Sequence, residues 1–106
     1  MFKLKSENVV LWPVIINEPV DGGKVKKHKC QVRFKLLKQA EFDLFYTDDR
    51  ALLKQVIKGW EGLGDESGEL LEFNEDNLQA LTDIAFVRSS LISGYLSANT
   101  GAQVKN

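Results

Sequence analysis

The chain has few of the residues that crosslinking, metal binding and nucleophilic catalysis draw on. Its 106 residues include one cysteine, Cys30, and one histidine, His28. A single cysteine excludes a disulfide within the chain and is typical of a reducing compartment. One histidine and one cysteine also cannot make the usual zinc site of four Cys and His ligands. The fold must therefore be held by its apolar core.

Long apolar runs are absent as well. No stretch approaches the roughly 20 residues that cross a bilayer as a helix. The first residues also lack the apolar run, roughly 7–15 residues long, of a signal peptide. The hydrophobic share of 43% and the charged share of 27% are those of an ordinary globular domain. The sequence predicts a single cytoplasmic domain that contacts no membrane.

The net charge of -1 hides an uneven distribution. Residues 1–40 carry nine Lys or Arg and three acids, whereas residues 41–106 carry five and twelve. Opposite charge at the two ends of a molecule can steer association, including self-association. The alternative is that both sets are solvated faces of one domain.

Residues 8–36 carry the signals of an antiparallel hairpin. The β-branched density of residues 8–17 favours a strand, and Pro13, which has no N–H, predicts an edge or bulged position for it. Residues 21–23, Asp-Gly-Gly, predict the turn. Apolar residues then alternate with polar ones, which predicts one buried and one exposed face. The apolar set is Cys30, Val32, Phe34 and Leu36.

Helical signals fill the second half of the chain. A short helical turn is predicted over residues 38–45, and Thr47 is the predicted cap of the next helix. The apolar spacing that follows predicts a helix as far as Trp60. Asn74 is a second predicted cap. A helical pattern then continues to Leu96, with a break at residues 82–84.

These patterns predict an α+β fold, with an N-terminal antiparallel hairpin or small sheet packed against C-terminal helices. The predicted domain covers residues 1–98, and residues 99–106 form a flexible tail. No catalytic, cofactor or metal residue is predicted. His28 lies between two lysines with no partner group, and Cys30 faces inward. The acidic stretch over residues 61–72 lacks the spacing of a calcium loop and the Lys-Ser/Thr of a phosphate loop.

A row of basic residues on the polar side of the second strand suggests one binding function. Such a row could meet phosphate, as in a small nucleic-acid-binding module. However, this side of the strand has no aromatic residue on which bases could stack. Lysine-rich strands also protect against aggregation, which leaves a solvated face as the alternative. The row consists of Lys27, Lys29, Arg33 and Lys35.

Six segments follow one another in a fixed order over residues 8–98. They are the hairpin across Pro13 with its turn at 21–24, the strand at 32–37 running into 39–42, Trp60-Glu61-Gly62, residues 65–68, residues 71–78 and the helix at 84–95. This ordered set resembles the tail assembly chaperones of long-tailed bacteriophages and prophages. Two departures from that pattern are visible. Asn74 stands where the family often has serine, and Ala85-Phe86 stands where a proline often breaks the chain.

The resemblance implies a non-enzymatic assembly factor in the cytoplasm of a bacterial host. Members of this family bind the tape measure protein during virion morphogenesis, so that protein is the predicted partner, with the major tail protein second. A homo-oligomer and a longer, frameshifted form are also implied. The apolar stripes of the two long helices are the predicted partner-binding surface, with burial in the core as the alternative. Its residues are Leu53, Ile57, Trp60, Phe86, Ile92 and Tyr95.

Overall fold

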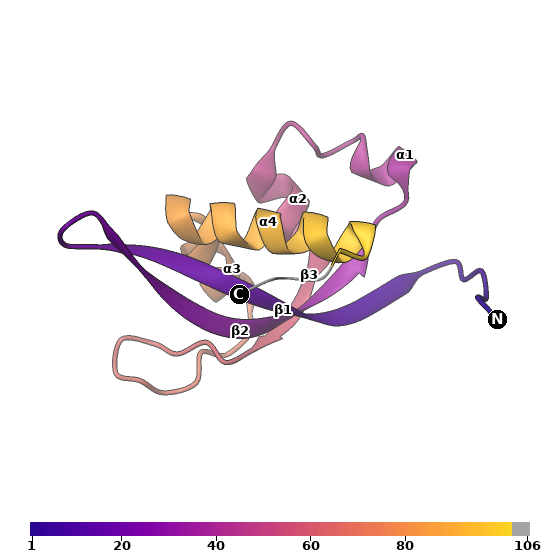
Figure 1. Ribbon diagram of the computed structural model, residues 1–106. Coiled ribbons are helices and arrows are strands. Elements are labelled where there is room, and N and C mark those ends of the chain that lie inside the picture. The colour runs from indigo at the N-terminus through magenta and orange to yellow at the C-terminus, as the bar shows by residue number, and fades with distance from the viewer. Residues whose placement is uncertain (103–106) are drawn as a thin grey trace.

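A computed structural model of the chain describes residues 1–102. An antiparallel sheet with strand order β1-β2-β3 carries the helices on one of its faces, and α4 lies lengthwise along the β1–β2 hairpin (Figure 1). The predicted α+β class is confirmed. The elements are β1 (Asn8–Val20), β2 (Lys24–Leu36), α1 (Gln39–Phe42), α2 (Asp49–Val56), β3 (Ile57–Glu61), α3 (Glu75–Thr82) and α4 (Ala85–Thr100).

The hairpin forms where the sequence predicts it. β1 pairs with β2 over its whole length, and Gly22 and Gly23 adopt positive φ angles of 83° and 72° in the turn. β1 is an edge strand, as Pro13 predicts. The Asn17 N–H points away from β2 and donates to Ser90 Oγ at 3.1 Å. Since alternate residues of a strand face the same way, Pro13 also faces the free edge, where a missing N–H weakens no ladder.

The core lies between the sheet and α4. The even-numbered side chains of β1 and β2 point toward the helices and include Val14 and Phe34, which are almost fully buried. Gly94 lets α4 lie directly on β1, because a Cβ there would be 2.7 Å from Val14 Cγ2. The next residue, Tyr95, packs edge-on against Phe34 with ring centroids 5.5 Å apart. Its hydroxyl oxygen accepts a hydrogen bond from the Leu37 N–H at 3.0 Å.

The predicted helix through Trp60 is wrong in its last part. α2 ends at Val56, and the residues that follow form β3, which pairs with β2 at Val32↔Trp60 and Arg33↔Gly59. A short apolar run fits either a helix or a strand. Residues 57–61 form a strand because they can pair with the open edge of β2, which is present only in the folded protein. A register shift between Arg33 and Phe34 then brings Ile57 onto the buried face.

Helix starts follow the local signals with one correction. Asp48 rather than Thr47 caps α2, with its Oδ1 accepting from the Ala51 N–H at 3.1 Å. Asn74 caps α3 as predicted, with its Oδ1 accepting from the Asn77 N–H at 2.8 Å. The predicted break is confirmed, because α3 ends at Thr82 and α4 begins at Ala85.

The predicted flexible tail, residues 99–106, overlaps the last turn of α4. The helix continues to Thr100, and Gly101 ends it with a φ of 73°. Residues 103–106 lie outside the described part of the chain. Within residues 1–102, no helix has the length and apolar character needed to cross a membrane.

We predict that Tyr95→Phe destabilises the protein by about 1–3 kcal/mol, because it leaves the Leu37 N–H buried without an acceptor. The matched control is Tyr46→Phe, because Tyr46 is 59% exposed and its change should alter the free energy of unfolding by no more than about 0.5 kcal/mol. Urea unfolding followed by circular dichroism measures both variants. Equal midpoints for Tyr95→Phe and the wild type would show that this hydrogen bond adds no stability.

Candidate functional site

The six residues predicted to bind a partner do not form one surface. Leu53, Ile57 and Tyr95 have exposed fractions of 0%, 2% and 0%. They lie in the core because α2 and α4 turn Leu53 and Tyr95 toward the sheet, while β3, a strand of that sheet, turns Ile57 toward the helices. For these three residues the predicted surface is therefore wrong, and the alternative of burial in the core is correct.

The other three predicted residues are half-buried and already have partners inside the fold. The Trp60 Nε1–H donates to the Leu71 carbonyl at 2.8 Å, and its ring meets Phe73 edge-on at 4.8 Å. Through these contacts Trp60, a residue of β3, holds the end of the acidic loop against the sheet. Phe86 and Ile92 of α4 pack against the margin of the core. None of these three offers a freely exposed apolar side chain.

In the acidic loop, residues 61–72, the Asp65 carboxylate accepts hydrogen bonds from the loop's own backbone. Asp65 Oδ1 accepts from the N–H groups of Ser67 and Glu69 at 2.9 and 3.0 Å. A β-bridge between Gly64 and Leu70 closes the loop. In the described range, no group of three or more His, Cys, Asp or Glu side chains is placed to hold a metal ion. The loop is therefore held in its shape by hydrogen bonds among its own residues.

Cys30 and His28, the two residues with the most reactive side chains, do not contact each other's partners: Cys30 is buried in the core, and His28 pairs with Glu18. Burial raises the pKa of the Cys30 thiol to about 11, so it stays protonated at neutral pH. His28 Nε2 lies 2.9 Å from Glu18 Oε1 on the exposed part of the hairpin. A protonated, buried thiol is a poor nucleophile. The arrangement supplies no activated group for covalent chemistry at these two positions.

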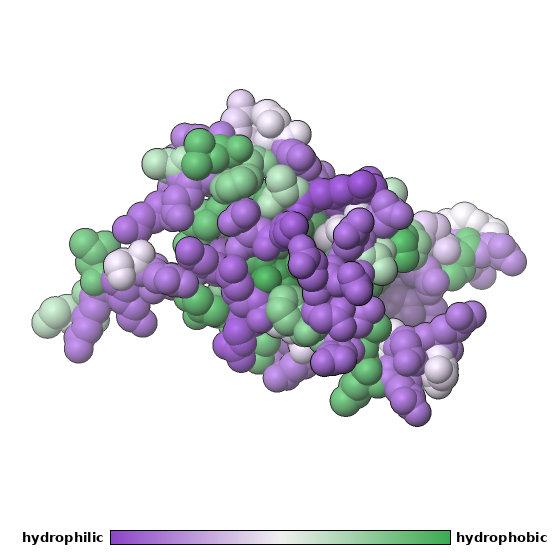
Figure 2. Space-filling view, turned by 180° about the vertical axis from the view of Figure 1, so that it is seen from behind, coloured by the Kyte–Doolittle hydropathy of each residue, from purple (hydrophilic) through white to green (hydrophobic). Residues whose placement is uncertain are grey.

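An exposed apolar cluster surrounds α1 and the turn after it, and we call it the α1 patch. Leu44 and Tyr46 are 75% and 59% exposed, while Phe42 and Phe45 are half-buried. The Phe42 and Tyr46 rings stack with centroids 6.3 Å apart, and the Tyr46 N–H donates to the Phe42 carbonyl at 3.0 Å. Figure 2 shows hydrophobic surface gathered at this upper corner of the molecule.

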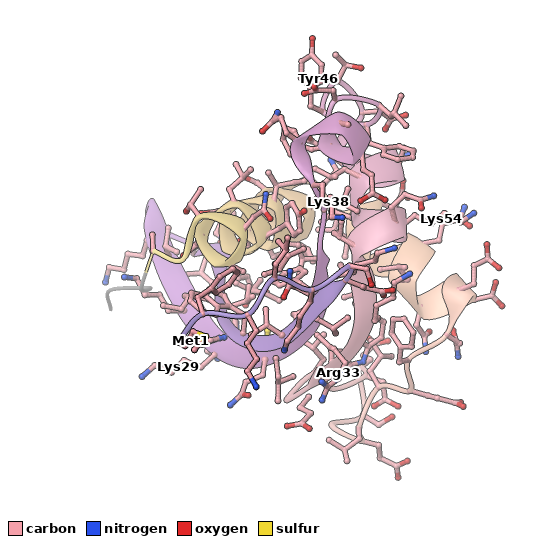
Figure 3. All side chains as sticks on the ribbon, turned by 90° about the vertical axis from the view of Figure 1, so that its right-hand side faces the viewer. Met1, Lys29, Arg33, Lys38, Tyr46 and Lys54 are labelled. Carbon is pink, nitrogen blue, oxygen red and sulfur yellow. The ribbon has the colours of Figure 1, made fainter. Side chains whose placement is uncertain are left out.

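Sequence reasoning missed the α1 patch, although its signal is local. Four apolar or aromatic residues fall within five positions, in a helical segment too short to bury them all. Exposed clusters of this kind mark binding sites more often than single apolar residues do. In Figure 3, Tyr46 stands at the top of the molecule, far from the sheet.

The predicted basic row lies on the outer face of the sheet, the face opposite the helices, and its end at Lys27 reaches the free edge of β1, where Lys27 lines a hollow with Ser90 and Ser93 of α4. Lys27, Lys29 and Arg33 are exposed and Lys35 is half-buried. Figure 3 shows Lys29 and Arg33 pointing away from the helices. A shallow hollow of about 390 Å³ lies at the middle of this face. Its lining includes Pro13, Lys29, Gln31, Glu61 and Gly62.

Sequence reasoning also missed an apolar row beside the basic one. The pairing register places Val9 opposite Lys35, Leu11 opposite Arg33, and Ile15 opposite Lys29. Directly opposed residues share a face in an antiparallel pair. The outer face is therefore amphipathic across its width, with aliphatic residues on β1 and cations on β2.

No family model matches the chain, and neither the curated proteins nor the solved structures include a match to it.

The raised thiol pKa of Cys30 gives a testable pH dependence. The ordinary pKa of a cysteine thiol, 9.0, applies to the unfolded chain, whereas burial raises the pKa of Cys30 in the folded protein to about 11. The stability contributed by the protonated thiol is therefore complete below pH 9 and is lost as pH rises toward 11. We expect the wild type to lose more stability over this range than Cys30→Ala. Urea midpoints of both proteins at several pH values check this, and parallel curves would refute the shift.

Proposed function

We propose that the chain is a non-enzymatic tail assembly chaperone of a long-tailed phage or prophage. It binds the tape measure protein in the bacterial cytoplasm and shields apolar helical segments until the tail tube assembles. The observation that carries this proposal is the α1 patch. Phe42 and Phe45 anchor it to the core, while Leu44 and Tyr46 remain exposed.

The ordering of the α1 patch supports a role in binding. Phe42 and Phe45 pack against the core, which anchors the segment, while Leu44 and Tyr46 project outward. A side chain that is already held in position loses little conformational entropy on binding. Large apolar residues that stay exposed also carry a risk of aggregation, which a binding function explains.

The rest of the surface supports binding over catalysis. The cavity of about 300 Å³ between α2 and α3 is lined by Arg50, Lys54 and Glu75 among others. Arg50 pairs with Asp83, and Lys54 pairs with Glu75 at 3.0 Å, so these cations are already neutralised. A catalytic site would need convergent, activated polar groups. The charged groups around this cavity are used to tie the helices together.

We predict that Leu44→Ser/Tyr46→Ser weakens binding of the tape measure protein by more than about tenfold, since truncating the side chains that anchor an interface costs about 2 kcal/mol or more. The two proteins, from the same phage, are co-expressed, and the soluble fraction of the tape measure protein is measured. Affinity then follows from titration of the purified chain against the soluble segments.

The matched control is Leu70→Ser, because Leu70 is 86% exposed in the acidic loop, away from the α1 patch. It should bind as the wild type does. All of these variants should unfold at the wild-type midpoint, since the altered side chains are mostly exposed. Unchanged binding by the folded double variant would reject the α1 patch, and a wild-type chain that leaves the tape measure protein insoluble would reject the chaperone function.

A further inference from the structure

We propose that the outer face of the sheet is a second docking surface, and that its occupant is an acidic amphipathic helix of a partner protein. This inference rests on the proposed function only in taking a helical protein as the partner. The surface consists of Val9, Leu11 and Ile15 on β1 and Lys27, Lys29, Arg33 and Lys35 on β2.

The four cations of this face form no ion pair within residues 1–102. The ion pairs among residues 1–102 join His28 to Glu18, Arg50 to Asp83 and Lys54 to Glu75. None of them involves the four cations of the outer face. A row of unpaired cations favours an acidic partner, whose approach it also accelerates.

The apolar row restricts the occupant further. Val9 is 46% exposed, and Leu11 and Ile15 are half-buried beside the cations. A purely polar partner would remove these aliphatic groups from water without packing against them. A helix with an apolar stripe beside an acidic stripe matches both rows at once, because helix faces divide in that way.

The dimensions also suit a helix. From residue 27 to residue 35 the basic row spans about 27 Å, at about 3.4 Å per strand residue. A helix of about 18 residues covers that length. The 16-residue helix α4 already covers the other face of the same two strands. A partner helix on the outer face would complete a three-layer arrangement of helix, sheet and helix.

Nucleic acid fits this face less well. Single-stranded nucleic acid sites combine cations with aromatic side chains on which bases stack. The residues of this face on β1 and β2 are aliphatic, cationic or polar, with no aromatic side chain among them.

The test uses a fluorescent helical peptide of about 18 residues, long enough to span the basic row. The peptide carries a leucine stripe flanked by glutamates, and a matched peptide carries glutamine in their place. Fluorescence anisotropy measures binding to the full chain at low and at high salt. We expect the glutamate peptide to bind at least about tenfold more tightly than the glutamine peptide, with the difference shrinking as salt screens the charges.

The variant Lys29→Glu/Arg33→Glu should weaken binding of the glutamate peptide by at least about tenfold, because it reverses two charges on the face. The matched control, Lys24→Glu/Lys38→Glu, changes net charge equally. Lys24 lies at the hairpin tip, and Lys38 lies on the helix side in Figure 3. The control should bind as the wild type does. Leu44→Ser/Tyr46→Ser should keep the preference for the glutamate peptide over the glutamine peptide, which separates the outer face from the α1 patch.

Four results would overturn the inference. The wild type could fail to bind the glutamate peptide, or the two charge-reversed variants could lose affinity equally. A single-stranded DNA probe could bind more tightly than the peptide and depend on Lys29 and Arg33, which would assign the face to nucleic acid. Sedimentation could show a wild-type dimer that Lys29→Glu/Arg33→Glu dissociates, which would assign the face to a second copy of the chain.

Discussion

The contact of α4 with the β1–β2 hairpin is the constraint on which the rest of the structure depends. A two-stranded hairpin is marginally stable in water unless an apolar layer covers one face. Gly94 allows α4 to approach β1. The ring of Tyr95 packs edge-on against Phe34, and its hydroxyl oxygen accepts a hydrogen bond from the Leu37 N–H. Ser90 accepts from the Asn17 N–H at the free edge. Three residues within one and a half turns of the helix therefore fix its distance, direction and rotation on the sheet.

This contact also decides which apolar residues remain for binding. Once α4 lies on β1 and β2, the apolar stripes of α2 and α4 are buried in the core, and Ile57 of β3 is buried with them. The short helix α1 lies between β2 and α2 in the chain, and this segment is too short to bury all of its aromatic side chains. The α1 patch is therefore surface left over after the core is complete, on a segment that the core still anchors through Phe42 and Phe45.

Local signals in the sequence predicted the elements that local interactions decide. Pro13, the glycine turn and the Asn74 cap each act within a few residues, and all three lie where the pattern places them. The end of α2 was mispredicted because the choice between helix and strand at Ile57 depends on the open edge of β2. Periodicity identified Leu53 and Tyr95 as apolar, but it could not show whether packing would use them or leave them exposed.

The chemistry of the outer face changes from one edge of the sheet to the other. Glu61 and the acidic loop after it continue from β3, whereas the aliphatic row lies on β1 at the opposite side of the cations. An acidic helix approaching this face would be attracted by β2 and repelled on the β3 side. The repulsion would move it toward β1, where its apolar stripe meets Val9, Leu11 and Ile15. Attraction and repulsion together would thus select one docking position, which the cations alone could not do.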